Sequence, residues 1–272
     1  MSHRRYIFVP NKEHFMGTKN YKSVFILRVY KFDQCEKPAY RIDKEEIERN
    51  GYAEPGLNVF ESENGIYLTL AGAEKAIKKL AKDKGNGIYS FLIEEKPVGG
   101  TFFTRDTLSR RRYLKNGKLW QKCEVSGIRY FNGKDIDLGE TGFYGRDLKT
   151  IPFKEGDIVE IAHNDFVQLA IIWSLPPSIE YMKPIWERHR IRGKKFSRIH
   201  PDDSDDAYTI AYYDVGKDGE IGYGHSHPAV VDVLPPSLPV PRKIAAELRR
   251  RLKMLQDECE QYAKEHEDDL PF

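Results

Sequence analysis

The stretch from residue 153 to residue 178, FKEGDIVEIAHNDFVQLAIIWSLPPS, constrains the fold most, because it reads as strand, tight turn, strand and proline stop. A three-residue loop at 163–165 sets Glu160 opposite Gln168 and leaves apolar pairs on the other face: Val159–Leu169 and Ile161–Val167. A two-residue loop would instead place Glu160 opposite Leu169 and mix the faces. Since strand side chains alternate, we predict the three-residue loop, and this hairpin as the heart of a β-rich domain.

The composition is that of a soluble globular protein. The 272 residues are enough for two domains, and 44 Lys and Arg nearly balance 42 Asp and Glu. The three cysteines, Cys35, Cys123 and Cys259, lie far apart and outside any CxxC pattern, which favours a reducing compartment over a disulfide framework. No apolar run is long enough to span a membrane. We therefore expect a cytoplasmic protein with no membrane contact, and no cofactor is predicted.

The first hundred residues alternate between strand and helix patterns. Runs rich in β-branched and aromatic residues predict strands at 5–9, 23–31, 65–70 and 88–94. Asp43 followed by Glu46 has the spacing of a capping box, which predicts a short helix ending near Gly51. A second helix is predicted over 72–84. Together these elements predict a small α+β domain over residues 1–100.

From residue 101 to residue 234 the pattern becomes one of hairpins. Asn-Gly pairs at 116–117 and 132–133 predict tight turns, and a loop at 217–219 ends on a glycine suited to the left-handed conformation. The expected cross-strand pairs are Leu114–Leu119, Tyr113–Trp120, Ile128–Ile136, Arg129–Asp135, Val215–Ile221 and Tyr213–Tyr223. Several short strands with regular turns predict a central antiparallel β-barrel-like region, of an SH3-like kind, over 101–234.

The C-terminal part reads as a stiff linker followed by one long helix. Residues 235–241, PPSLPVP, should be extended, and an amphipathic helix is predicted over 242–268. Its apolar seam repeats at alternating spacings of three and four: Ala245, Leu248, Leu252, Leu255, Cys259 and Tyr262. The first half is basic and the second acidic. We expect the seam to dock on the chain's own body in a monomer, and an antiparallel homodimer is the alternative.

One candidate anion or nucleic-acid site lies on the Asn-Gly hairpin at 116–117. In the predicted register, four cations and two aromatic residues share a face: Arg111, Tyr113, Lys115, Lys118, Trp120 and Lys122. Like charges lie directly across the ladder, which is unfavourable unless an anion relieves them. Cations around an aromatic pair can also hold phosphates and stack bases. The alternative is that both aromatic residues pack inward while the cations reach the rim.

The string HSHP at 225–228 is the one catalytic-looking motif. It resembles the metal-binding centre of the JAMM metalloprotease family, in which HxHP on a strand supplies two zinc ligands. Residues i and i+2 on a strand share a face, so His225 and His227 could meet one Zn²⁺. The position that should hold the aspartate ligand is Pro239. The alternative is a structural pair of histidines in a hairpin beside Thr209 and Ala211.

The sequence leaves three functions open. The sequence contains no P-loop and no GxSxG elbow. The phrase GIYLTL followed by AGAEKAI resembles a strand–helix step of ADP-ribosyltransferase folds, which implies an ADP-ribosyltransferase-like enzyme as one alternative. A metal-dependent hydrolase centred on His225 and His227 is another. The leading interpretation is a non-enzymatic binding or adaptor protein for a protein partner or an anionic ligand.

Overall fold

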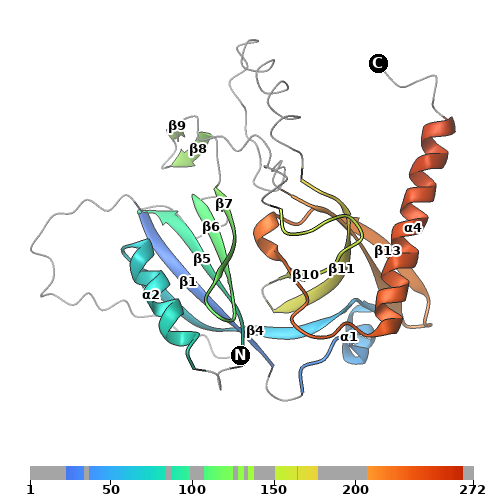
Figure 1. Cartoon of the computed structure of the whole chain (residues 1–272), viewed down its shortest axis with the longest axis horizontal. Helices are drawn as coiled ribbons and strands as arrows, with labels where there is room; N and C mark the ends of the chain where they lie inside the picture. Colours follow the sequence, from blue (N-terminus) through green and yellow to red (C-terminus); the bar gives the residue numbers. More distant parts are fainter. Residues whose placement is uncertain are drawn as a thin grey trace, which may run out of the picture.

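A computed structural model describes nine stretches of the chain: residues 23–33, 37–83, 87–98, 107–124, 128–131, 134–137, 151–163, 165–176 and 207–265. Within these stretches the protein is an α+β structure whose strands pair in antiparallel fashion (Figure 1). No helix in the described stretches is both long and apolar enough to cross a membrane. The predicted strand at 5–9 lies outside the described residues.

Most of the described strands join one twelve-stranded sheet. Its main path runs in the order β13-β12-β11-β4-β1-β5-β6-β7. The bounds along this path are β1 Ser23–Phe32, β4 Pro55–Tyr67, β5 Ile88–Pro97, β6 Ser109–Leu114, β7 Leu119–Glu124, β11 Phe166–Ser174, β12 Thr209–Gly216 and β13 Ile221–Ser226. Shorter strands pair beside it: β2 Arg41–Ile42, β3 Tyr52–Ala53, β10 Ile158–Ala162 and β14 Val233–Leu234.

Strand β4 links the strands on the β11 side of the sheet with the strands on the β1 side. Its first residues pair with β11, and the remainder from Val59 to Tyr67 pairs with β1. The close approach to β11 requires Gly56, because a Cβ atom there would lie 2.3 Å from the Val167 carbonyl oxygen. Strands from both sides of residue 100 therefore share one sheet, while the division of the chain into domains at that residue stays a prediction.

The two N-terminal helices begin and end at residues whose local chemistry explains them. Helix α1, Lys44–Asn50, has Asp43 as its N-cap and Gly51 in the left-handed conformation (φ 93°) as its C-cap, as predicted. Helix α2, Leu70–Leu80, begins after Thr69 and is shorter than the predicted 72–84. It covers one face of the sheet, where Ala73 and Ile77 pack against Leu27, Val29, Phe91, Ile93 and Tyr113.

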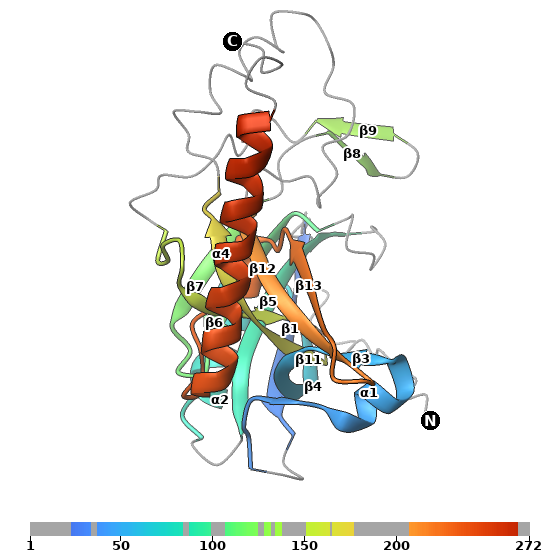
Figure 2. The same ribbon diagram turned by 90° about the vertical axis from the view of Figure 1, so that its right-hand side faces the viewer.

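Helix α4, Arg242–Glu265, docks on the body through its first half. Ile244, Ala245, Leu248 and Leu255 are buried, and the helix contacts β11 and β12. The Tyr223 hydroxyl of β13 donates a 2.6 Å hydrogen bond to Glu247. Beyond Leu255 each described side chain is exposed, and Figure 2 shows this end extending past the strands of the twelve-stranded sheet. The seam from Ala245 to Leu255 therefore docks in cis, while the choice between a monomer and an antiparallel homodimer stays a prediction.

The register of the central hairpin differs from the predicted one. Strands β10 and β11 place Glu160 opposite Leu169 and Ile161 opposite Gln168, and the His163 amide donates to the Phe166 carbonyl at 2.9 Å. The prediction of a three-residue loop was wrong. It assumed that one face of the hairpin meets water, whereas apolar clusters cover both faces and Glu160 points into one of them.

The other hairpins form where the turn signals predicted them, with two corrections of register. The loop at 217–219 pairs Val215 with Ile221 and Tyr213 with Tyr223, which confirms that prediction. Strands β8, Ile128–Phe131, and β9, Lys134–Asp137, pair on either side of the predicted turn, which itself lies outside the described residues. Their pairing is one residue away from the predicted register: Ile128–Asp137 and Arg129–Ile136.

The hairpin at 116–117 contains a bulge that the sequence did not reveal. Tyr113 pairs with Leu119, so the predicted pairs Leu114–Leu119 and Tyr113–Trp120 were wrong. The Gly117 amide donates to the Leu114 carbonyl at 2.8 Å, and Gly117 has a φ of 76°. Gly117 therefore adopts the left-handed conformation just after the tight turn. Asn116 and Gly117 do not form the predicted type I′ turn, in which both residues would have a positive φ.

Replacing Leu248 with Ala should test how strongly α4 is held. Leu248 is 0% exposed, so the truncation leaves a cavity and should lower the free energy of unfolding by about 2–5 kcal/mol. Urea denaturation followed by circular dichroism measures this change. The matched control is Gln256→Ala on the exposed end, which should stay within about 0.5 kcal/mol of the wild type. Equal effects of both changes would contradict docking through the first half.

Candidate functional site

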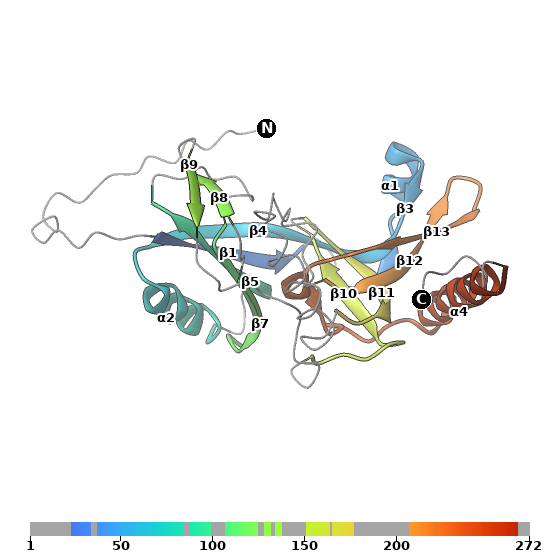
Figure 3. The same cartoon turned by 90° about the horizontal axis from the view of Figure 1, so that it is seen from above.

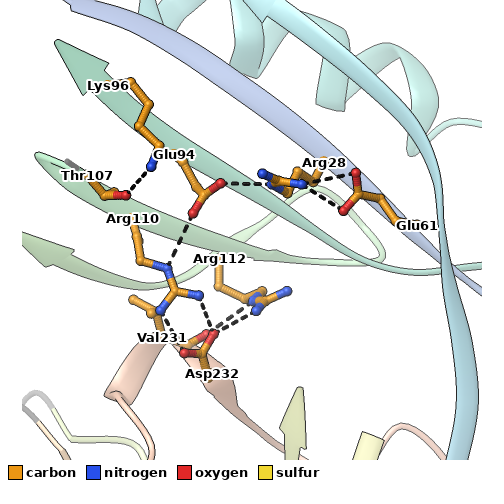
Figure 4. A network of polar contacts seen from close by, with 9 residues as sticks. All are labelled: Arg28, Glu61, Glu94, Lys96, Thr107, Arg110, Arg112, Val231 and Asp232. Carbon is orange, nitrogen blue, oxygen red and sulfur yellow. Dashed lines mark hydrogen bonds and ion pairs between the residues drawn. The ribbon is translucent and has the colours of Figure 1, made fainter. Parts of the chain in front are cut away.

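A row of alternating charges crosses the sheet on the face opposite α2 (Figure 4). Arg28 on β1 contacts Glu61 on β4 at 2.9 Å and Glu94 on β5 at 2.8 Å. Arg110 on β6 lies 4.0 Å from Glu94 and makes a bidentate pair with Asp232 at 2.7 and 2.8 Å. Each cation of this row therefore lies between carboxylates, and the row is held by charge-assisted hydrogen bonds.

Arg112 fastens the short helix η5, Val230–Asp232, to strand β6. Its side chain is 2% exposed, donates to Asp232 at 2.8 Å and to the Val231 carbonyl at 3.2 Å, and lies over the Tyr30 ring. Burial alone would raise the pKa of the Asp232 carboxyl, but the guanidinium groups of Arg110 and Arg112 outweigh it and lower that pKa. Asp232 thus stays ionised, and the charges of the row are used within the fold.

A second polar group, Glu160, lies at 0% exposure inside the body. It accepts hydrogen bonds from the Tyr40 hydroxyl, the Tyr89 hydroxyl (2.8 Å), and the Ser237 amide (2.8 Å) and hydroxyl (2.6 Å). Burial raises the pKa of Glu160, although these hydrogen bonds oppose the shift. Sequence reasoning missed this group, and the available signal was one Glu within the apolar strand IVEIA.

The predicted linker is part of the body rather than a free spacer. Ser237 binds Glu160, and Leu238 and Val240 pack against the same hydrophobic cluster. The Leu238 amide also donates to the Tyr40 hydroxyl at 3.3 Å. Residues 235–241 therefore form a strap that closes over the interior and leads directly into α4.

A perturbed carboxyl group, Glu54, lies between β3 and β4. Burial raises the pKa of Glu54 to about 7, and the negative charges of Asp214 and Glu46 add to the shift. Asp214 lies over Gly222, where a Cβ atom would stand 2.5 Å from its Oδ1 atom.

Among the residues that the structure describes, no group of three or more His, Cys, Asp or Glu side chains is arranged to hold a metal ion.

The two aromatic residues of the predicted hairpin site both pack into the protein, but on different faces of the sheet. Tyr113 is 4% exposed and donates to Glu74 of α2 at 2.8 Å. Trp120 donates through Nε1 to the Val233 carbonyl at 2.8 Å, and its ring packs edge-on against Phe153. The two rings therefore do not share a face, which corrects the predicted stacking pair. The bulge at Tyr113 is the physical cause, because it shifts the alternation of β7.

Three of the four predicted cations of that hairpin remain at the surface. Arg111 lies opposite Lys122, as predicted, and donates to the Ser109 hydroxyl at 2.6 Å. Lys115, Lys118 and Lys122 are exposed. The three lysines of the predicted site are thus exposed, whereas Arg111 is partly buried 3.8 Å from Glu95 and the aromatic part belongs to the core.

The structure brings further lysines of α2 to the same region. The hairpin tip lies against the end of α2, since a Cβ atom at Gly117 would be 3.3 Å from side-chain atoms of Ala81 and Ile77. Glu74, which binds Tyr113, shares a side of the helix with Lys78 and Lys82. We call the exposed lysines of the two elements the lysine surface: Lys75, Lys78, Lys79, Lys82, Lys115, Lys118 and Lys122.

The two histidines of the HSHP string lie on an exposed hairpin. His225 pairs with Ala211, and His227 Nδ1 lies 3.3 Å from the Thr209 hydroxyl, so both histidines lie beside the two residues expected for a structural pair. Their ring centroids are 6.0 Å apart, and His225 also packs against Trp173.

A scan against protein-family models, a search of the curated proteins and a search of the solved structures all found no match. The charge row and Glu160 hold the fold together, whereas the lysine surface is exposed. The lysine surface is therefore the strongest candidate for contact with another molecule.

Protein purified without chelator should carry no stoichiometric zinc. A catalytic zinc site normally uses three protein ligands and one water, and the HSHP string offers two histidines. Elemental analysis by mass spectrometry measures the bound metal. One equivalent of zinc that disappears in the His225→Ala, His227→Ala double variant would contradict this expectation and favour the hydrolase.

Stability should fall as the pH rises towards 7 because of Glu54. Its folded pKa of about 7 exceeds its ordinary value of 4.5, so the folded state holds the proton more tightly and loses stability as pH rises between those values. Glu54→Gln removes this penalty and should raise the free energy of unfolding by about 1–2 kcal/mol at pH 8, allowing for solvent screening.

The same Glu54 variant should match the wild type near pH 5, where the carboxyl is protonated in the folded protein. Urea denaturation at both pH values makes the comparison, and the exposed Glu220→Gln serves as the control. A Glu54→Gln gain of the same size at pH 5 and pH 8 would contradict the assignment.

Proposed function

We propose that this chain is a non-enzymatic binding protein whose β body presents the lysine surface to the phosphate backbone of nucleic acid. The observation that carries the proposal is the convergence of exposed lysines from α2 and from the β6–β7 hairpin. Whole-chain charge is nearly balanced, so the attraction comes from this local patch. No specific observation favours the hydrolase or the ADP-ribosyltransferase-like alternative.

A barrel-like body is the finer fold that this proposal includes. Strands β7, β6, β5, β1, β4, β11, β10 and β14 follow one another in hydrogen-bonded order. Trp120 of β7 donates to the Val233 carbonyl of β14 and so spans the step between these strands, and beside it Arg112 of β6 donates to the Val231 carbonyl of η5. These bonds support a barrel completed by side chains, and the SH3-like description remains a prediction.

The charge distribution supports binding at the outside of this body. On the inner face, Arg28, Arg110 and Arg112 are engaged by carboxylates, which makes them part of the fold. The lysine surface is exposed, so phosphates that approach it can replace its counterions. Release of counterions is the main source of sequence-independent affinity for nucleic acid.

The position of the aromatic residues indicates the mode of binding. Tyr113 and Trp120 make hydrogen bonds and ring contacts inside the protein, so neither offers a stacking platform for bases. Lysines that contact phosphates position a protein without reading sequence. We infer binding to the backbone with little base preference.

The cysteines support the cytoplasmic location that this function would require. Cys123 is buried and Cys259 is exposed, and neither forms a disulfide within the described residues. An exposed free thiol is typical of a reducing compartment.

Affinity for a labelled DNA duplex should fall steeply with salt. The Lys78→Glu, Lys118→Glu double variant removes one lysine from each element and should weaken binding at least about tenfold at low salt. Its plot of log affinity against log salt should be less steep by about 1.8, at roughly 0.9 for each lost phosphate contact. Fluorescence anisotropy across a salt series measures both quantities.

The control for this experiment is Lys217→Glu, which reverses an exposed lysine in the 217–219 loop, outside the lysine surface. It should bind the duplex as the wild type does. The proposal fails if the double variant keeps the wild-type affinity and slope, or if the control weakens binding as much as the double variant.

A further inference from the structure

The last turns of α4 form an acidic element outside the body. Each described side chain from Gln256 to Glu265 is exposed. Four of these residues are acidic and one is basic, and we call them the acidic end: Asp257, Glu258, Glu260 and Glu265, with Lys264. Glu258 lies 3.6 Å from Arg251 of the docked half, and Glu265 accepts a 2.8 Å hydrogen bond from Gln261.

The acidic end continues the docked helix, and its described side chains are exposed. Since most helical stability in proteins comes from tertiary packing of one face, this segment gains less of it than the docked part does. The partial negative charge of a helix C-terminus is unfavourable beside carboxylates, and this helix places its acidic residues there. Cations supplied by another surface would relieve both deficits. Since Tyr262 is 62% exposed on the same segment, such a surface would also cover an aromatic ring.

The lysine surface has the complementary charge, but it cannot reach the acidic end within one molecule. Figures 1 and 3 place α2 and α4 at opposite ends of the protein, with the sheet between them. A contact between the two elements therefore requires two copies of the chain.

We propose that the acidic end of α4 in one copy docks on the lysine surface of a second copy. The contact joins two different surfaces, so two copies either make it reciprocally in a closed two-fold dimer or pass it on head to tail in chains or rings. This inference goes beyond nucleic-acid binding and does not depend on it. Because both partners would occupy the lysine surface, nucleic acid and self-association should compete.

The interaction is built from exposed charges, which determines how it should behave. Exposed ion pairs are individually weak and are screened by salt. Association should therefore appear at low salt, increase with protein concentration, and disappear near about 0.5 M salt. Sedimentation velocity of the full chain, in reducing buffer so that Cys259 forms no disulfide, measures the size distribution.

A charge exchange gives the sharpest test. Asp257→Lys, Glu260→Lys reverses the acidic end, and Lys78→Glu, Lys118→Glu reverses part of the lysine surface. Each double variant alone should sediment as a monomer under conditions in which the wild type associates. An equimolar mixture of the two should associate again. The intact acidic end of one variant can dock on the intact lysine surface of the other, and the two reversed surfaces also carry opposite charges. Circular dichroism and the melting temperature of each variant check that both remain folded.

The outcomes separate this inference from its competitors. A wild type that stays monomeric at low salt overturns it. Association that is lost with the acidic end but not with the lysine surface would instead indicate pairing of two α4 helices, and also overturns it. The Asp257→Lys, Glu260→Lys variant should still bind DNA, so loss of self-association and loss of nucleic-acid binding are measured independently.

Discussion

The carboxylate of Glu160 is the polar group on which the arrangement of the body depends. It is fully buried and takes hydrogen bonds from three separate segments, through Tyr40, Tyr89 and Ser237. Leaving one of its lone pairs unsatisfied would cost on the order of 1–3 kcal/mol or more. Its requirement for donors therefore fixes the register of β10 against β11, and it holds the strap that leads into α4.

The charged residues divide into two groups with different roles. On the inner face, arginines and carboxylates alternate from β4 to η5, and their pairing holds η5 to the β6 strand. Planar guanidinium groups suit this role because they bind carboxylates in two-point contacts. The lysine surface instead carries lysines, whose flexible, strongly hydrated ammonium groups suit exchange of counterions. The arginines of the charge row thus hold the fold together, whereas the lysines of the lysine surface are exposed to solvent.

Features set by neighbouring residues could be predicted from the sequence. The cap at Asp43, the stop at Gly51 and the glycine loop at 217–219 depend on contacts over a few residues, and they form as expected. The seam of α4 also followed from its periodicity, because one apolar stripe of a long helix must be buried somewhere. In these cases local geometry and side-chain chemistry leave one favourable solution.

Tertiary structure alone decided the register of the central hairpin, the fate of the aromatic residues and the assembly of the lysine surface. Alternation cannot identify the inner face when both faces are buried, and it cannot foresee that distant hydroxyl groups will satisfy Glu160. A single bulge at Tyr113 separated it from Trp120. The hairpin lies beside α2, where Tyr113 binds Glu74, and this contact between residues 39 positions apart is one that no local pattern contains.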